Sequence, residues 1–278
     1  MKNMQQLKDL IKNMAQNENI NAQVLLRIYM MERLIERISL SKYRNNFILK
    51  GGLLVANLIG INSRSTVDID STISGLLVNI ESLRSIFEDI ISIDIGDDIE
   101  MVVKKIHKIR HDSDYTGIRI SLDAKYDKAR IPIKIDITTG DKITPEAIEY
   151  EYQLLLENRK VKLLAYNIKT VLAEKFETII SRSVINTRMR DFYDIHILLQ
   201  LKNDMIDYKI LKTAIYSTAE QRNSVNALKD IDIIIKEIFD DGIMKVRWDK
   251  YRMKFNYSHD ITWHIVKKSL FSICELVN

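Results

Sequence analysis

The sequence contains little cysteine, proline or glycine. Of its 278 residues, one is Cys, two are Pro and eight are Gly. The single cysteine, Cys274, excludes an intrachain disulfide framework and favours a reducing, cytoplasmic location. The scarcity of Pro and Gly argues against long disordered or loop-rich segments.

Long apolar runs and a strong charge imbalance are also absent. No uninterrupted apolar stretch approaches the roughly 20 residues that span a bilayer, so we expect no membrane partner. The N-terminal segment MKNMQQLKDLIKNMAQNENI is too polar for a secretory signal. Forty-two Lys and Arg against 38 Asp and Glu give a net charge of +4, which permits a nucleic-acid partner without requiring one.

Strand-type and helix-type patterns occupy different parts of the chain. The strands expected from alternating or β-branched runs are 47–49, 67–72, 99–109, 115–126 and 130–138, with a hairpin over 148–165. The helices expected from apolar residues three and four apart are 4–14, 21–41, 53–59, 80–91, 167–182, 190–202, 208–220, 224–239, 242–255 and 260–276. This segregation predicts an α+β domain over residues 1–165 and a helical domain over residues 166–278.

Asp68 and Asp70 form the motif with the most chemical content. Residues two apart in a strand point to one side, so both carboxylates would face one way while Val67 and Ile69 point into the core. Adjacent carboxylates repel each other unless a cation lies between them, and Mg²⁺ or Mn²⁺ suits such oxygen ligands. The alternative for an Asp-x-Asp motif is a solvent-exposed strand edge that carries two charges.

Asp136 lies on the polar face of the expected strand 130–138, opposite a run of alternating isoleucines. If this strand neighbours the strand of Asp68 and Asp70, a third carboxylate joins the pair. Three acids around two metal ions suit an in-line phosphoryl or nucleotidyl transfer. The alternative is an exposed strand residue beside Lys134.

Lys50-Gly51-Gly52 separates a short apolar run from an expected helix. Glycines in this position allow the backbone N–H groups to approach a phosphate, and the N-terminus of the helix favours an anion. A simple turn is the alternative.

The order of these motifs resembles that of a known family. FILKGG, a helix, RSTVDID and IKIDI follow one another as in the nucleotidyltransferase fold of the polymerase-β-like superfamily, and more narrowly as in the AbiEii/AbiGii toxin family. AEKFETIISR and RDFYDIHILL are similar to that family's Lys-bearing helix and Arg-Asp-x-x-Asp helix. The resemblance covers about residues 45–200. It implies a nucleotidyltransferase-type mixed β-sheet, followed by a helical domain that completes the active-site cleft.

The resemblance also implies roles for the matching residues. Those implied to be catalytic are Asp68, Asp70, Lys175 and Asp191. Those implied to contact the nucleotide are Lys50, Gly51, Gly52, Arg64, Ser65 and Asp194. The implied metal ligands are Asp68 and Asp70, with Asp136 as the third carboxylate.

The implied function is that of a toxin in a bacterial toxin–antitoxin or phage abortive-infection system, with a separately encoded antitoxin. The toxin would use Mg²⁺ or Mn²⁺ to transfer nucleotides from a nucleoside triphosphate to RNA, with tRNA as the first expectation. Gly52 and Leu53 depart from the family, which often has Ser or Thr there, so a hydroxyl that would bind phosphate is missing. Two alternatives therefore stay open: a degenerate transferase that only binds nucleotide or protein, and a transferase that modifies small molecules such as antibiotics.

The helical half contains further motifs with two interpretations each. Lys175 lies beside an apolar stripe and is either a solvated lysine or a phosphate-neutralising one. Asp191 is either a helix cap or an essential acid. Arg182, Arg188 and Arg190 gather in one connection that would suit a triphosphate or an RNA backbone. The segment 245–255 interleaves basic and aromatic residues, which is typical of an RNA-binding helix or of an aromatic core face.

Overall fold

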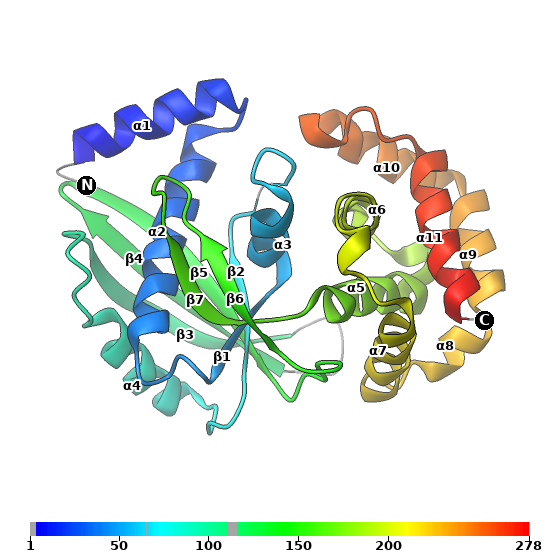
Figure 1. The fold of residues 1–278 in the computed structure, drawn as a ribbon, viewed down its shortest axis with the longest axis horizontal. Helices are drawn as coiled ribbons and strands as arrows, with labels where there is room; N and C mark the ends of the chain where they lie inside the picture. The colour runs from blue at the N-terminus through cyan, green and yellow to red at the C-terminus, as the bar shows by residue number, and fades with distance from the viewer. Residues whose placement is uncertain (1–3, 65, 111–115, 278) are drawn as a thin grey trace. The chain divides into compact units, whose positions relative to one another are not determined.

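The computed structural model describes residues 4–64, 66–110 and 116–277, which form two compact units (Figure 1). The first unit contains the chain up to Asp141 together with Ile148–Ala165. The second contains Lys142–Ala147 and the chain from Tyr166 onward. The short segment 142–147 thus belongs to the helical unit, although it lies between two strands in the sequence. No helix of the described residues is long and apolar enough to cross a membrane.

The first unit is built on one mixed sheet of seven strands in the order β3-β4-β5-β2-β1-β7-β6. The strands are β1 (Phe47–Lys50), β2 (Ile69–Ile73), β3 (Glu100–Arg110), β4 (Thr116–Tyr126), β5 (Ala129–Thr139), β6 (Ile148–Gln153) and β7 (Lys160–Ala165). Its helices are α1 (Met4–Asn17), α2 (Ala22–Leu40), α3 (Gly51–Ile59) and α4 (Ile80–Ile91). The α+β fold class predicted from the sequence is confirmed.

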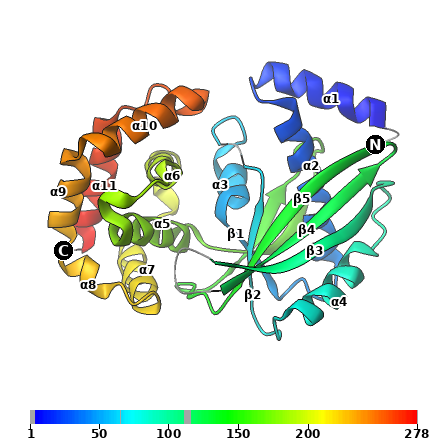
Figure 2. The same cartoon turned by 180° about the vertical axis from the view of Figure 1, so that it is seen from behind.

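One face of this sheet is buried and the other is polar. Ile131, Ile133, Ile135 and Ile137 of β5 are buried, and α2 packs against β5 while α4 packs against β3. In Figure 2, β3, β4 and β5 lie in front of α2, so the face turned toward the viewer is the one away from that helix. Val67 does not point into the core as predicted, because β2 begins only at Ile69 and Val67 is exposed.

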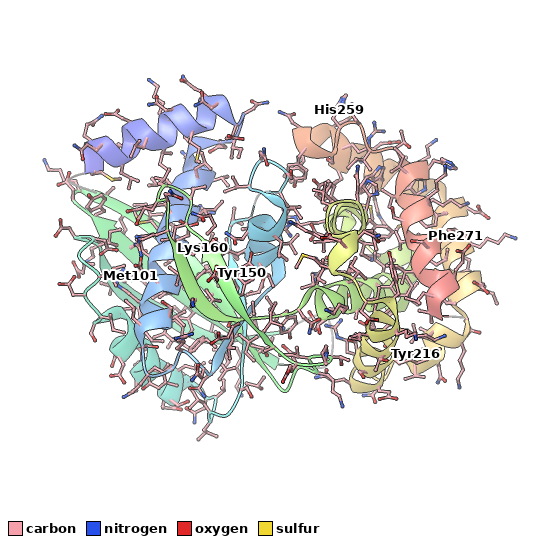
Figure 3. All side chains as sticks on the ribbon, in the orientation of Figure 1. Met101, Tyr150, Lys160, Tyr216, His259 and Phe271 are labelled. Atoms are coloured by element: carbon pink, nitrogen blue, oxygen red, sulfur yellow. The ribbon has the colours of Figure 1, made fainter. Side chains whose placement is uncertain are left out.

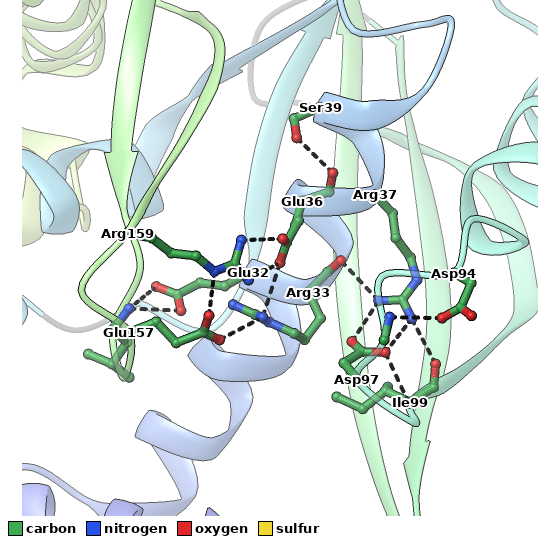
Figure 4. Close-up of polar contacts among 12 residues, drawn as sticks. Glu32, Arg33, Glu36, Arg37, Ser39, Asp94, Asp97, Ile99, Glu157 and Arg159 are labelled. Carbon is green, nitrogen blue, oxygen red and sulfur yellow. Dashed lines mark hydrogen bonds and ion pairs between the residues drawn. The ribbon is translucent and has the colours of Figure 1, made fainter. Parts of the chain in front are cut away.

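Helix α2 carries a group of buried charged side chains, shown in Figure 4. The Arg37 guanidinium donates to both carboxylate oxygens of Asp97 at 2.7 and 2.9 Å. Arg33 donates to Glu157 at 2.8 Å, and Glu36 accepts from Arg159 at 2.9 Å. Removing one partner from a buried ion pair is strongly destabilising because the other charge is left uncompensated. These pairs therefore fix the loop before β3 and the β6–β7 turn onto α2.

The β6–β7 hairpin also holds α3 in place. The hydroxyl of Tyr150, labelled in Figure 3, donates to Asn57 Oδ1 at 2.7 Å. Asn57 Nδ2 donates in turn to the carbonyl of Gln153 at 2.8 Å. Because α3 begins at Gly51, directly after β1, these bonds stabilise the helix whose N-terminus carries the glycine pair.

The second unit is helical, as the sequence predicts. Its α-helices are α5 (Ile168–Arg182), α6 (Met189–Leu201), α7 (Tyr208–Gln221), α8 (Val225–Lys229), α9 (Ile231–Asp240), α10 (Gly242–Lys254) and α11 (Trp263–Val277). The single helix predicted over 224–239 is wrong: α8 ends at Lys229 and α9 begins at Ile231. Asp230 separates them, and aspartate favours helix ends over helix interiors.

Aromatic side chains fill the core between α6, α9, α10 and α11. Trp248 is fully buried and donates from its indole nitrogen to the carbonyl of Ile261 at 3.0 Å. It stacks on Tyr251, and Trp263 packs against Phe239 with ring centroids 4.5 Å apart. Trp248 and Tyr251 therefore belong to a core face, as the second interpretation of this segment expects, whereas Phe255 is half-buried just after α10.

The pH dependence of stability should report on Glu32. Burial raises the pKa of Glu32 to about 8, and the N–H of Leu155 and the charge of Arg33 offset only part of this rise. The folded pKa lies above the unfolded value of about 4.3, so the stabilisation from the bound proton is complete below that value. It is lost as the pH rises through about 8. The free energy of unfolding, measured in urea, should therefore fall less between pH 5 and pH 8 for Glu32→Gln than for wild type.

The exposed Glu88 of α4 provides the matched control. Glu88→Gln should keep the pH dependence of the wild type. Identical slopes for wild type and Glu32→Gln would contradict the assignment of the buried proton to Glu32.

Candidate active site

Lys50, Asp70 and Asp136 lie side by side across three neighbouring strands of the first unit. Lys50 of β1 is the register partner of Asp70 on the antiparallel strand β2. Asp70 is in turn the register partner of Asp136 on the parallel strand β5. Register partners project from the same face of a sheet, with Cβ atoms about 5 Å apart. Two of the three carboxylates predicted to cluster are therefore neighbours.

The glycine pair lies directly against Asp70. Gly51 has φ +65°, and a Cβ atom at this position would lie 2.1 Å from Asp70 Oδ2. The N–H of Gly52 donates to the same Oδ2 at 3.3 Å. Only a residue without a side chain leaves room for this carboxylate, so the glycines serve the acid as well as any bound anion.

The electrostatics of Asp70 follow from these neighbours. Burial, and then the negative charge of Asp136, raise the pKa of Asp70 above its usual value. The Lys50 ammonium and the Gly52 N–H lower it and offset part of this rise. A site that disfavours its own carboxylate charge in this way is suited to a cation.

Asp136 is engaged by an arginine that the sequence did not identify. Arg119 of β4 donates from Nε to Oδ1 at 2.7 Å and from Nη2 to Oδ2 at 2.6 Å. Both carboxylate oxygens thus accept from one guanidinium, the two-pronged arrangement that suits this pair of groups. Among the described residues, no three His, Cys, Asp or Glu side chains are grouped so as to hold a metal ion.

Lys50 is bound to Asp141, a residue that the sequence patterns did not single out. Its ammonium forms an ion pair with Asp141, which accepts further hydrogen bonds from the hydroxyls of Thr72 and Thr138, each at 2.6 Å. Burial raises the pKa of Asp141, but Lys50 and these hydroxyls outweigh it and lower the pKa to about 2. Asp141 is therefore ionised at neutral pH and fixes the position of the Lys50 side chain.

Arg64 and Thr66 lie next to the second glycine. A Cβ atom at Gly52 would lie 2.6 Å from Arg64 Nη1 and 2.7 Å from Thr66 Oγ1. Both side chains are buried. A hydroxyl group is thus present beside Gly52, supplied by Thr66 instead of by residue 52 or 53. Ser65, also predicted to contact the nucleotide, lies outside the described residues, and Asp68 is half-buried just before β2.

The second unit contains its own buried charge cluster. Lys175 of α5 forms ion pairs with Asp191 at 2.9 Å and Asp194 at 2.7 Å, both on α6. Asp194 is fully buried and Asp191 nearly so. Burial raises the pKa of Asp191, but Lys175 and then Arg188, at 2.8 Å, outweigh it and lower the pKa below its usual value. Lys175, Asp191 and Asp194, to which the resemblance assigned roles at the site, are therefore brought together.

The amino-acid sequence matches the sequence model of one protein family over most of its length. The sequence model described as "Nucleotidyl transferase AbiEii toxin, Type IV TA system" matches residues 33–266. The chain belongs to the AbiEii toxin family. It is therefore a nucleotidyltransferase toxin by family, and a type IV toxin–antitoxin system implies a separate antitoxin as partner. No curated protein sequence matches the chain.

Several solved structures are similar to this AbiEii family member at low identity. A Helicobacter pylori protein described as a "putative nucleotidyltransferase" is 15% identical, with a TM-score of 0.49, and the match covers 93% of this chain and 97% of that one. JHP933 from Helicobacter pylori is 14% identical, with a TM-score of 0.47 and coverage of 92% and 91%. An antigenic nucleotidyltransferase-like protein from Paracoccidioides brasiliensis is 14% identical, with a TM-score of 0.41 and coverage of 74% and 92%. The family assignment rests on the sequence match and not on these structures.

Replacing Lys175 should unfold the helical unit of this AbiEii family member more readily. Lys175→Met removes the cation between two buried carboxylates, and breaking a buried pair in this way costs about 3–5 kcal/mol. We expect a lower midpoint in urea unfolding, followed by the circular dichroism of the helices. Lys245→Met on α10 replaces an exposed lysine and should leave the midpoint unchanged. A wild-type midpoint for Lys175→Met would contradict a stabilising role.

Proposed function

We propose that this chain is a metal-dependent nucleotidyltransferase toxin that transfers a nucleotidyl group from a nucleoside triphosphate to RNA, with tRNA as the expected acceptor. The observation that supports it most directly is the placement of Asp70. This carboxylate lies against the Gly51-Gly52 backbone, between Lys50 and Asp136, with Asp68 two residues before it. Such a site combines a cation-binding carboxylate with backbone that an anion can approach.

The residues present fit one hard divalent cation such as Mg²⁺. Asp70 and Asp68 offer carboxylate oxygens, and burial together with the charge of Asp136 raises the pKa of Asp70, so a nearby cation would favour its ionised form. Mg²⁺ is commonly held by one or two carboxylates plus water and substrate phosphates, so two protein ligands suffice. Asp136 is less suited to be a ligand, since both of its oxygens already accept from Arg119. A bound cation would supply charge stabilisation at the phosphate during transfer.

In the proposed reaction a hydroxyl of the RNA loses its proton to solvent and its oxygen attacks the α-phosphorus. The bond from the α-phosphorus to the oxygen that bridges it to the β-phosphorus breaks, and pyrophosphate leaves. Gly51 and Gly52 allow the phosphates to approach the backbone. Lys50, held by Asp141, contributes a fixed positive charge beside Asp70. Catalysis of this kind depends on positioning and on electrostatic stabilisation more than on covalent chemistry by the protein.

Asp68→Asn and Asp70→Asn should abolish the transfer of labelled nucleotide to RNA. The substitution keeps the shape of the side chain but removes the charge that would hold the cation. The assay is incubation of the purified protein with each radioactive nucleoside triphosphate, Mg²⁺ and total tRNA. Asp127→Asn, at an exposed turn, is the control and should label RNA as wild type does.

The outcomes of this assay separate the candidate functions. Labelling by both active-site variants at the wild-type rate would refute the proposed mechanism. Growth arrest by an Asp70→Asn variant that labels no RNA would instead favour a protein that acts by binding. A wild type that labels an aminoglycoside and no RNA would favour a small-molecule transferase.

Gly51→Ala should lower transferase activity by at least an order of magnitude, because the new methyl group would overlap Asp70 Oδ2. Gly96→Ala is a matched control. Gly96 has a φ of +68°, close to that of Gly51, and a Cβ atom there would meet no atom within 4 Å, so alanine imposes the unfavourable φ without a steric overlap. Initial rates of both variants, compared at equal folded fraction, test the role of the glycine. Equal losses in the two variants would show that backbone strain alone accounts for the effect.

A further inference from the structure

The row of charged residues at Asp70 continues across the polar face of the sheet. Asp136 is the register partner of Arg119 on β4, and Arg119 is the register partner of His107 on β3. A second row runs beside it on the same face, formed by Lys105 of β3, Ser121 of β4 and Lys134 of β5. The two rows lie about 7 Å apart, since residues two apart on a strand share a face.

The cations of the second row are not neutralised by neighbours on the sheet. Lys105 and Lys134 are exposed, and among the described residues no ion pair joins either of them to a carboxylate. Cations farther along the same strands are paired instead. Arg130 lies 3.5 Å from Asp123, and Lys125 lies 2.9 Å from Glu100. Unpaired positive charge on this face is therefore concentrated in the part nearest Asp70 and Asp136.

Arg119 connects this positive patch to the candidate active site. Its side chain is 31% exposed although Asp136 holds its guanidinium at two points, so it has a fixed orientation and an accessible surface. Because arginine stays protonated in proteins, this guanidinium is a permanent cation beside Asp70 and Asp136, and an arginine of this kind suits a phosphate.

We propose that Lys105, Arg119 and Lys134 form a phosphate-binding strip that holds the phosphodiester backbone of the RNA acceptor on the polar face of β3, β4 and β5. This inference rests on the proposed function, because it assigns the binding surface for the acceptor of that reaction. It also assigns to Asp136 the task of orienting Arg119 in place of that of a metal ligand.

The extent of the strip favours a polymer over a single nucleotide. Strand β3 lies three strands away from β2, and Lys105 is also two residues out of the row of Asp70, so the two Cα atoms are about 16 Å apart at the usual strand spacing and rise. The phosphates of one nucleoside triphosphate are contiguous and would be held at Gly51 and Gly52. A polynucleotide carries a phosphate at every residue and reaches both places. Affinity for such a chain rises with the number of phosphates that lysine and arginine neutralise.

Reversing the charge of the two lysines tests the strip. Lys105→Glu together with Lys134→Glu should weaken the binding of fluorescently labelled total tRNA roughly tenfold or more at 0.1 M salt, measured by anisotropy without nucleotide. Replacing both lysines by Ala should lower the slope of log K against log salt by about 2. Lys8→Glu with Lys12→Glu changes the same charge at exposed positions on α1 and should bind tRNA as wild type does.

Steady-state kinetics with varied tRNA or varied nucleotide identify the ligand. The strip predicts that the variant at residues 105 and 134 raises the KM for tRNA and leaves the KM for the nucleoside triphosphate unchanged. A rise only in the KM for nucleotide would overturn the proposal and assign the strip to the triphosphate. Equal losses of tRNA binding in the strip variant and in the α1 control would also overturn it, since net charge alone would explain both.

The binding assay also separates this inference from the proposed function. A strip variant that binds tRNA like wild type, together with inactive Asp70→Asn, would refute the strip and leave the transferase intact. Loss of tRNA binding in the strip variant, in a protein whose wild type labels no RNA, would support an RNA-binding surface and refute the transferase.

Discussion

The close approach of two like charges is the constraint around which the sheet unit is built. Asp70 and Asp136 occupy register positions on adjacent strands, where their carboxylates repel each other. The protein compensates each one differently. Asp136 receives the guanidinium of Arg119, whereas Asp70 receives the Gly52 N–H and the more distant charge of Lys50. Burial keeps the pKa of Asp70 above its usual value despite these two groups, and a bound cation would favour the ionised form.

Much of this arrangement follows from local patterns in the sequence. Alternation along 130–138 correctly separated a buried face from a polar one, and it placed Asp136 on the polar side. The Asp-x-Asp motif and the glycine pair were recognisable because strand and turn chemistry depend on neighbouring residues. The sequence also predicted that Asp191 and Asp194 lie on one side of a helix, since residues three apart on a helix share a face.

The missed residues depend on contacts between strands that no local pattern encodes. Arg119 reaches Asp136 only because β4 pairs with β5 in one particular register. Asp141 follows β5 in a loop, and it meets Lys50 through the pairing of β1, β2 and β5. Thr66 supplies the hydroxyl that residues 52 and 53 lack because its segment folds back against Gly52. Strand order and register are set by the whole sheet, so single-sequence reasoning cannot give them.

The segment 142–147 has a consequence for dissecting the molecule. Asn167, which caps α5, donates to the carbonyls of Thr144 and Glu146 at 3.0 and 2.8 Å, and Thr170 donates to Thr144 at 3.1 Å. The backbone thus leaves the sheet unit after Asp141, returns at Ile148 and leaves it again after Ala165. A single cut at residue 165 would separate 142–147 from Asn167 and Thr170, so the segment and the start of α5 would both lose these hydrogen bonds. A fragment of the C-terminal helices that keeps these hydrogen bonds must therefore carry this hexapeptide as well.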